Sequence, residues 1–317
     1  MEKIFEYARK NNISDIHIIE GERIYFRKDG EIVACDDVQT LSREDILNIC
    51  SGRFEEDFAY SDSKGQRYRI NSFFTKGKLA LVIRVINNEA IKLKGEFINK
   101  VIDEKILALK DGLVLISGIT GSGKSTTLAN IVEKFNENKK IKILTIEDPI
   151  EYIFENKKSL IIQRELGKDV ESFEKALKSS LRQDPDVIVL GEIRDEESLF
   201  SALKLAETGH LVFSTLHTMS TVESINRLIS MSKSDRRDFV REQLASVLRF
   251  VFSQELYRDK KTKEVKAIFE ILNNTKAVAN LIANNKLNQI PSLIESGIEN
   301  YMITKEKYLK KIEIESD

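Results

Sequence analysis

"LVLISGITGSGKSTTLANIVEKF", residues 113–135, joins an apolar run to a stretch with helical spacing through a glycine-rich loop. The loop contains the pattern Gly118-x-x-x-x-Gly123-Lys124-Ser125. Between a strand and a helix this pattern predicts a phosphate-binding P-loop, because its backbone N–H groups can turn toward phosphate oxygens. We expect Lys124 to neutralise the β- and γ-phosphates and Ser125 to ligate Mg²⁺. The predicted nucleotide-binding residues are Gly118, Thr120, Gly121, Ser122, Gly123, Lys124, Ser125 and Thr126.

Further short apolar runs follow this loop, and most are separated by stretches with helical periodicity. The alternation is typical of a largely parallel sheet between layers of helices, so the predicted fold class is α/β. Ligands of such sheets bind at the carboxyl ends of the strands. The predicted strands are 112–117, 141–146, 159–163, 186–191 and 211–216.

Three acidic residues, Glu147, Asp148 and Glu151, come directly after the predicted strand 141–146. Taken alone, such acids are usually solvated loop residues. After a P-loop and a strand they can instead lie near a bound cation, because Mg²⁺ prefers carboxylate oxygens and water. We therefore predict that Glu147 and Asp148 hold Mg²⁺, partly through water, and that Glu147 also takes part in catalysis.

Another acid, Glu192, follows the predicted strand 186–191 and the glycine that ends it. A phosphoryl-transfer site needs a group that orients and deprotonates the attacking water. We predict that Glu192 is this general base. The alternative is a surface acid that happens to follow a buried strand.

Two of the three histidines flank the predicted strand 211–216. His217 comes at its carboxyl end, where it can donate a hydrogen bond to the γ-phosphate or to the lytic water. His210 lies at the other end, and six residues of strand span about 20 Å, so it cannot reach the same point. We predict a catalytic role for His217 and a structural or inter-subunit role for His210.

Length and composition favour a two-domain globular protein. The chain has 317 residues, of which 41% are hydrophobic and 32% charged, with a net charge of −1. This balance gives no electrostatic case for binding nucleic acid or an anionic membrane. No apolar run is long enough to span a bilayer. The isolated Cys35 and Cys50 suit a reducing compartment and give no case for structural zinc, so we expect a cytoplasmic protein.

The first part of the chain predicts a small α+β domain. Helices are expected at 2–11 and at 41–50, the second with Ser42 as its N-cap. Hairpins are expected at 23–35, turning at Asp29-Gly30, and at 67–86, turning near Lys76-Gly77.

The domain boundary is expected within 88–100, where polar residues interrupt the strands. A helix-rich stretch follows near 97–110. From residue 222 onward the pattern is mostly helical, apart from a possible strand at 266–272.

Four stretches, taken together, identify a family. "GITGSGKST", "TIEDPIEY", "DPDVIVLGEIRD" and "AETGHLVFSTLHT" occur in this order and resemble the Walker A, Asp box, Walker B and His box of the secretion and pilus motor ATPases. Within that RecA-like P-loop group, the chain is most similar to the type IV pilus retraction ATPases. The resemblance implies a PAS-like domain at 1–95 and a RecA-like ATPase domain with a C-terminal helical segment at 96–317.

The same resemblance implies a homohexameric ring that binds ATP and Mg²⁺ between its two domains. It also implies docking on an inner-membrane pilus platform protein at the cytoplasmic side of the membrane. The family uses arginines of the first domain to contact phosphates, and the matching residues are Arg69 and Arg84. The alternative interpretation is that both arginines simply lie on the exposed face of a hairpin.

Three further residues are candidates for coupling across the site or between subunits: Arg182, Arg194 and His210. For the two arginines, ion pairs with Asp186 or Asp195 are an equally good interpretation.

Retraction is favoured over assembly because the chain lacks the large extra N-terminal region and the four-cysteine zinc module of the assembly relatives. One departure is "AVANLIA", in which Ala279 and Ala283 replace arginines usual in the family. The alternative interpretation of 277–285 is an amphipathic helix packed on the core of its own domain.

Other possible functions are a pilus-assembly, competence or type II secretion ATPase, a DNA-translocating ring ATPase, and a non-hydrolysing ATP-binding regulator.

Overall fold

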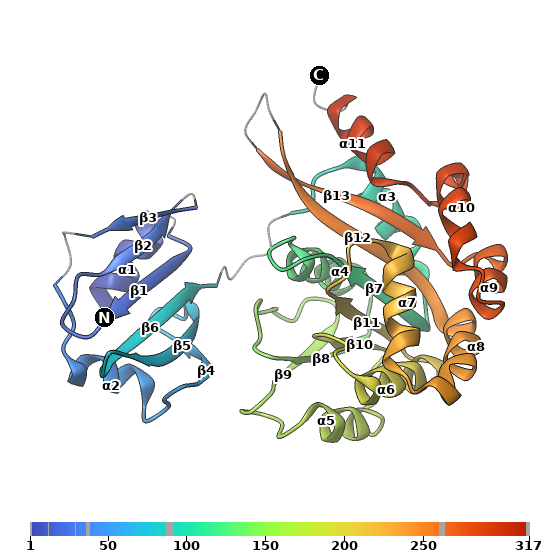
Figure 1. Cartoon of the computed structure of the whole chain (residues 1–317). Helices are drawn as coiled ribbons and strands as arrows, with labels where there is room; N and C mark the ends of the chain where they lie inside the picture. Colours follow the sequence, from blue (N-terminus) through green and yellow to red (C-terminus); the bar gives the residue numbers. More distant parts are fainter. Residues whose placement is uncertain are drawn as a thin grey trace. The chain divides into compact units, whose positions relative to one another are not determined.

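Two sheets organise the chain, each with hydrophobic cores of its own (Figure 1). The computed structural model describes residues 2–11, 13–28, 30–35, 39–86, 92–259 and 264–314. The chain divides into two compact units, Met1–Glu89 with Pro149–Ile153, and Ala90–Asp148 with Phe154–Asp317. The boundary expected within 88–100 falls partly on 87–91, which lie outside the described residues.

The first unit is an antiparallel sheet with strand order β3-β2-β1-β6-β5-β4. Alternate strand residues, such as Ile16 and Ile18 in β1 or Leu81 and Ile83 in β6, are buried with the apolar faces of α1 and α2. The predicted small α+β domain is therefore present. Its elements are α1 (Glu2–Lys10), β1 (Asp15–Ile19), β2 (Tyr25–Lys28), β3 (Glu31–Ala34), α2 (Arg43–Cys50), β4 (Asp57–Ser61), β5 (Arg67–Thr75) and β6 (Lys78–Val85).

The local signals in this unit behave as the sequence predicts. Ser42 caps α2, its hydroxyl accepting from the Asp45 N–H at 3.2 Å while the Asp45 carboxylate accepts from the Ser42 N–H at 2.9 Å. Lys76 and Gly77 both have positive φ and form the two-residue turn between β5 and β6. β2 and β3 form the other hairpin, while Asp29 of its expected turn lies outside the described residues.

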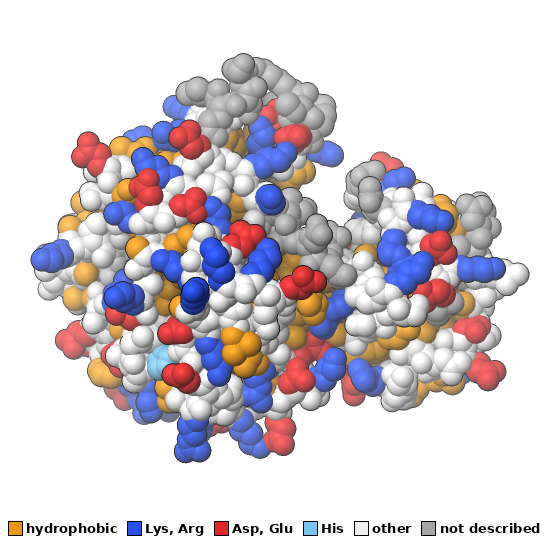
Figure 2. Space-filling view, turned by 180° about the vertical axis from the view of Figure 1, so that it is seen from behind, with side chains coloured by type: hydrophobic (Ala, Val, Ile, Leu, Met, Phe, Trp, Pro, Cys, Tyr) orange, Lys and Arg blue, Asp and Glu red, His pale blue; other side chains and the backbone are white. Residues whose placement is uncertain are grey.

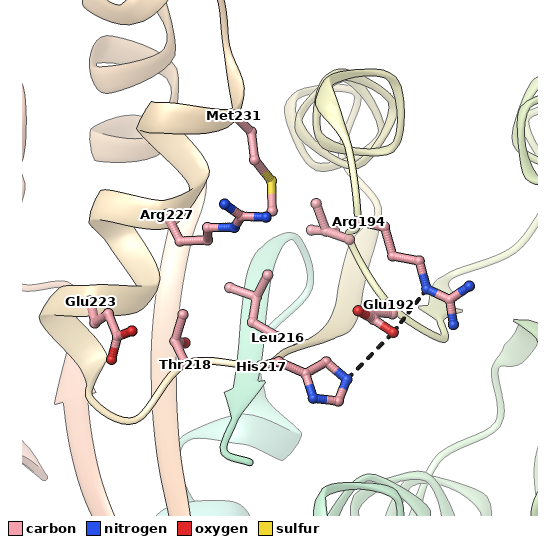
Figure 3. A pocket seen from close by; sticks show the side chains of 9 residues that line it. Glu192, Arg194, Leu216, His217, Thr218, Glu223, Arg227 and Met231 are labelled. Atoms are coloured by element: carbon pink, nitrogen blue, oxygen red, sulfur yellow. Dashed lines mark hydrogen bonds and ion pairs between the residues drawn. The ribbon is translucent and has the colours of Figure 1, made fainter. Parts of the chain in front are cut away.

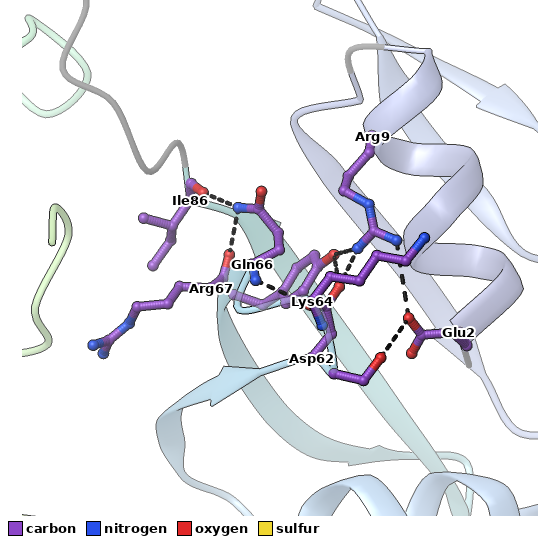
Figure 4. A network of polar contacts seen from close by, with 9 residues as sticks. Glu2, Arg9, Asp62, Lys64, Gln66, Arg67 and Ile86 are labelled. Atoms are coloured by element: carbon purple, nitrogen blue, oxygen red, sulfur yellow. Dashed lines mark hydrogen bonds and ion pairs between the residues drawn. The ribbon is translucent and has the colours of Figure 1, made fainter.

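A buried carboxylate, Asp62, organises the turn between β4 and β5 (Figure 4). One of its oxygens accepts from the backbone N–H groups of Lys64 and Gln66, each at 2.9 Å. The other accepts from the Tyr68 hydroxyl at 3.1 Å and from the Arg9 guanidinium. Burial, together with the negative charge of Asp62, raises the pKa of Tyr68. The network ties α1 to β5.

Replacing Asp62 by alanine is expected to lower the free energy of unfolding of the first unit by about 3 kcal/mol. The change leaves the largely buried Arg9 charge and two turn N–H groups without their acceptor. Hydrogen exchange of α1 and β5 amides in the intact chain, followed against urea, measures this loss. Asp57→Ala is the control, because it breaks only an exposed ion pair and should cost less than about 1 kcal/mol. Equal losses in the two variants would contradict the assignment.

The second unit is a mixed sheet with strand order β13-β12-β7-β11-β10-β8-β9, in which only the pair β12 and β13 is antiparallel. Its strands are β7 (Gly112–Ser117), β8 (Lys142–Glu147), β9 (Leu160–Glu165), β10 (Val187–Leu190), β11 (Leu211–Leu216), β12 (Leu248–Arg258) and β13 (Val265–Asn273). Its helices are α3 (Glu96–Glu104), η1 (Ile106–Ala108), α4 (Lys124–Asn138), α5 (Phe173–Ser180), α6 (Glu196–Glu207), α7 (Thr221–Met231), η2 (Ser234–Arg236), α8 (Arg237–Val247), α9 (Lys276–Ala283), η3 (Leu287–Gln289), α10 (Ile290–Ser296), η4 (Ile298–Asn300) and α11 (Lys305–Ile314).

Helices cover both faces of this sheet, as the predicted layering requires (Figure 1). In β7, Leu113 and Leu115 enter one core together with residues of α5 to α10. Val114 and Ile116 enter the other core together with α3, α4 and α11. Because successive strand residues point to opposite faces, a strand buried on both sides reads as a continuous apolar run. All five strands predicted for this part are confirmed as β7, β8, β9, β10 and β11.

The prediction for the end of the chain is wrong in one element. The possible strand at 266–272 is confirmed as β13, but 248–258 forms β12 rather than continuing a helical region. α8 ends at Val247 and β12 begins at Leu248, with no glycine or proline between them to mark the change. α9 packs Val278 and Ile282 into the core, as expected for an amphipathic helix.

Surface charge is mixed on the face shown in Figure 2. There, Lys and Arg side chains alternate with Asp and Glu side chains over the described residues. Among the described residues, no helix combines the length and the apolar character needed to cross a membrane.

Candidate functional site

The order of strands in the second sheet brings four chain segments together. β7, β11, β10 and β8 are neighbours in that order and run in parallel, so their carboxyl ends meet at one edge. The P-loop follows β7, His217 follows β11, Glu192 comes shortly after β10, and Asp148 follows β8. From the sequence we expected the carboxyl ends of these strands to lie at one edge of the sheet. The structure adds the order of the strands, in which β11 lies between β7 and β10.

The P-loop has the backbone that its glycines permit. Gly118 has φ 152, and a Cβ added there would lie 2.4 Å from the Gln254 carbonyl oxygen and 2.4 Å from the Ser122 hydroxyl. Gly123, with φ 85, is the N-cap of α4 and has no side chain to cap it. The first N–H groups of α4 are therefore left for an anionic ligand. Lys124, only 8% exposed, donates to the carbonyls of Gly118 at 2.6 Å and Ile119 at 3.1 Å, which places its ammonium over the loop.

Gln254, a buried residue of β12, holds the P-loop and α4 through two side-chain hydrogen bonds. The Gln254 amide nitrogen donates to the Ser122 carbonyl at 2.6 Å, and its oxygen accepts from the Thr127 hydroxyl at 2.7 Å. The residue is 3% exposed, so it fixes the loop to the sheet without contacting solvent. No feature of the sequence pointed to Gln254, because its partners lie more than a hundred residues away and its strand was not predicted.

The general base and histidine predicted from the sequence lie side by side (Figure 3). The Nε2 atom of His217 is 3.5 Å from a carboxylate oxygen of Glu192. Its other ring nitrogen, Nδ1, is 3.5 Å from the hydroxyl of Thr120 in the P-loop. The imidazole therefore lies between the P-loop and the carboxylate, with one ring nitrogen toward each.

Arg194 lies on the other side of Glu192 (Figure 3) and also approaches Asp148. Its Nε donates to Glu192 at 3.0 Å, and its Nη1 is 3.6 Å from Asp148. The hydrogen bond to Glu192 and the nearby carboxylate charges raise the pKa of Arg194. The alternative of an ion pair with Asp195 is not what the structure shows: Asp195 caps α6, and Arg194 pairs with Glu192 and Asp148.

The two acids at the end of β8, Glu147 as its last residue and Asp148 directly after it, have different partners. Glu147 accepts from the Thr145 hydroxyl at 2.6 Å and from the Gln163 amide of β9 at 3.3 Å. Asp148 is exposed and faces Arg194. Glu151 belongs to the segment assigned to the first unit.

Magnesium fits the oxygen donors at this edge. Ser125 in the first turn of α4 offers a hydroxyl, and Glu147 and Asp148 offer carboxylates. In the part of the chain that the structure describes, no three His, Cys, Asp or Glu side chains are grouped to hold a metal alone. Mg²⁺ is commonly bound through one or two carboxylates together with substrate phosphates and water.

A cavity of about 480 Å³ reaches Glu192 and His217 from the side of α7 (Figure 3). Its lining includes Arg194, Thr218, Glu223 and Arg227. Solvent can therefore reach both the carboxylate and the imidazole.

The remaining candidates in the second unit lie away from this group. Arg182 is exposed, and within the described residues no carboxylate lies within 4.0 Å of it. Its alternative partner, Asp186, accepts instead from the Lys142 N–H at 2.8 Å. His210 contacts the Leu205 carbonyl and the Thr208 hydroxyl, each at 3.1 Å. Both contacts of His210 are with residues that closely precede it, at the end of α6 and in the turn that follows α6.

Arg69 and Arg84 face each other across β5 and β6 in the first unit. Arg69 pairs with Asp57 at 3.3 Å and Arg84 with Asp15 at 2.9 Å. Both side chains are partly exposed. Contact with phosphates and simple exposure on a hairpin face both stay open as interpretations of these two arginines.

Comparison with known proteins identifies relatives over nearly the whole chain. A family model described as "Type II/IV secretion system protein" matches residues 1–312. The YggR protein of Escherichia coli (strain K12) is 40% identical over 312 residues, covering 96% of this chain and 95% of YggR. The type IV pilus retraction ATPase PilT of Pseudomonas aeruginosa (strain PAO1) is 37% identical over 310 residues, covering 93% and 88%.

Solved structures agree on the fold. A crystal structure of the pilus retraction motor PilT with bound ADP superposes with a TM-score of 0.86 at 34% identity, covering 98% of this chain and 92% of PilT. The predicted RecA-like core with a small N-terminal α+β domain is thereby confirmed. The chain belongs to the type II/IV secretion system protein family and is an ATPase of its P-loop class.

Proposed function

We propose that the chain is the Mg²⁺-dependent ATPase of a homohexameric motor that powers type IV pilus retraction. Its partner would be an inner-membrane platform protein, on whose cytoplasmic side the ring docks. The observation that carries the hydrolytic part is the contact of His217 with both Glu192 and the P-loop residue Thr120. The likeness to PilT supports the mechanical part.

In this proposal the P-loop and Lys124 bind the triphosphate, while Ser125, Glu147 and Asp148 hold Mg²⁺ directly or through water. Bound Mg²⁺ would neutralise charge on the β- and γ-phosphates. Glu192 takes the proton of the attacking water as it approaches phosphorus in line.

Two sets of side chains would stabilise the charge of the reacting phosphate. His217 donates a hydrogen bond to the terminal phosphate or to the lytic water. Arg69 and Arg84 would contact phosphates from the first domain, since a planar, permanently charged guanidinium suits transition-state charge. Closure and reopening of the domains then supply the movement. Arg182, Arg194 and His210 stay candidates for coupling between subunits.

The direction of force is tested by deleting the gene in its own organism and counting surface pili. Retraction predicts more pili together with lost twitching motility. Cells without pili would instead assign the motor to assembly. Hydrolysis stimulated by DNA would favour a translocating ring, and tight ATP binding without turnover would favour a regulator.

In His217→Ala we expect hydrolysis to fall about 100-fold with only a modest loss of ATP affinity. The imidazole would act on charge that develops during the reaction, so its removal affects turnover more than binding. Phosphate release gives the rate, and titration with a fluorescent ATP analogue gives the dissociation constant. His210→Ala, at the far end of β11, should have a far smaller effect on turnover. An unchanged rate in His217→Ala would return this histidine to a structural role.

A further inference from the structure

The segment 218–220, which joins His217 to α7, is anchored to the far edge of the sheet. At its end, the backbone N–H and the hydroxyl of Thr221 both donate to one carboxylate oxygen of Glu270, at 2.8 and 2.7 Å. In its middle, the Met219 carbonyl accepts from the Ser253 hydroxyl and from the Lys305 ammonium, each at 2.8 Å. Side chains of β12, β13 and α11 thus hold the residues that follow His217.

These anchors lie level with the start of the P-loop. Leu216 of β11 is paired with Ser117 of β7, Ser117 with Ser253 of β12, and Ser253 with Glu270 of β13. Ser117 directly precedes the P-loop, and Leu216 directly precedes His217. One row of residues across four strands therefore sets where both catalytic segments begin.

The next residue of β12 holds the other side of the site. Gln254 bonds the P-loop at Ser122 and the helix α4 at Thr127, as described above. Successive residues of a strand point to opposite faces, so Ser253 and Gln254 can hold the His217 segment and the P-loop from one short stretch of β12.

We infer that Glu270 is a positioning residue that keeps His217 within reach of Glu192 and Thr120. Its carboxylate accepts two hydrogen bonds at the first residue of α7, where a negative charge also suits the helix dipole. The two contacts of His217 are both 3.5 Å, at the outer limit of hydrogen bonding. A small shift of the segment 218–220 therefore breaks both contacts of His217. This inference rests on the proposed role of His217 in hydrolysis.

The test compares Glu270→Ala with Glu270→Gln in the full-length chain. We expect Glu270→Ala to lower kcat about tenfold with little change in KM, because displaced catalytic groups affect the reaction more than binding. Glu270→Gln should recover most of the rate, since its amide oxygen can accept both bonds from Thr221. Glu299→Ala, an exposed acid on η4, is the control and should behave as wild type.

A double-mutant cycle separates positioning from general stability. In a His217→Ala background, Glu270→Ala should lower Tm as in the wild type but should not lower kcat further. An equal loss of kcat in both backgrounds would show that Glu270 acts independently of His217 and would overturn the inference. So would a fall in Tm alone, with kcat unchanged in Glu270→Ala although His217→Ala lowers it.

A second readout keeps the inference testable if His217 has no part in hydrolysis. The chain has three histidines, so the NMR signal of the His217 ring can be assigned with His217→Ala. Glu270→Ala should shift this signal, whereas Glu299→Ala should not. A ring signal that Glu270→Ala leaves in place would refute the positioning role, while a shift without any rate effect of His217→Ala would refute only the proposed catalytic role.

Discussion

Lys124→Ala is expected to weaken ATP binding about 100-fold or more and to reduce hydrolysis below detection. Lys124 is 8% exposed, and its ammonium lies over the carbonyls of Gly118 and Ile119, where a triphosphate would place its β- and γ-oxygens. Removing one partner of a buried charge pair costs about 2–5 kcal/mol, and 2.7 kcal/mol corresponds to about 100-fold in affinity.

Calorimetric titration with ATP and a phosphate-release assay measure the two effects. Lys140→Ala is the matched control, because Lys140 is an exposed lysine just beyond the end of α4. Thermal unfolding of both variants separates lost binding from lost folding. Tight nucleotide binding by Lys124→Ala would contradict the assignment of the P-loop.

Glu192→Gln is expected to keep ATP binding and to lose turnover by about 10²- to 10⁴-fold, the usual contribution of a general base. The substitution preserves shape and a hydrogen-bond acceptor for Arg194, whose Nε lies 3.0 Å away. It removes the carboxylate that takes the proton from water.

Single-turnover hydrolysis and nucleotide titration distinguish these two effects. Glu197→Gln, an exposed acid in the first turn of α6, should hydrolyse ATP at the wild-type rate. A wild-type rate in Glu192→Gln would remove Glu192 from the reaction and leave the contact with His217 as a structural one.

The parallel strands could be predicted from sequence because burial on both faces leaves continuous apolar runs, as in Leu113 to Ile116. The P-loop could be predicted because its glycines meet a backbone requirement at fixed spacing. Glu192 and His217 could be placed near it because each follows such a strand. The prediction depends on strand ends alone and needs no knowledge of strand order.

The contacts behind the site could not be predicted from sequence. β12 follows α8 without a breaking residue, so the helical pattern conceals its start. Gln254, Ser253 and Glu270 act through partners that are distant in the chain, and only strand pairing brings them together. The contact of Arg194 with Asp148 likewise depends on how the loops after β8 and β10 meet.

Because β7, β8, β10 and β11 are parallel, all four begin at one edge of the sheet and end at the opposite edge. The two edges should tolerate chemical modification differently. The chain enters β8 at Lys142, and a strand of six residues spans about 20 Å before Asp148 is reached. A fluorophore or affinity handle grafted at the exposed Lys140 therefore lies a whole strand length from the phosphate-facing edge. Surface immobilisation through that residue would leave nucleotide exchange unobstructed within the subunit.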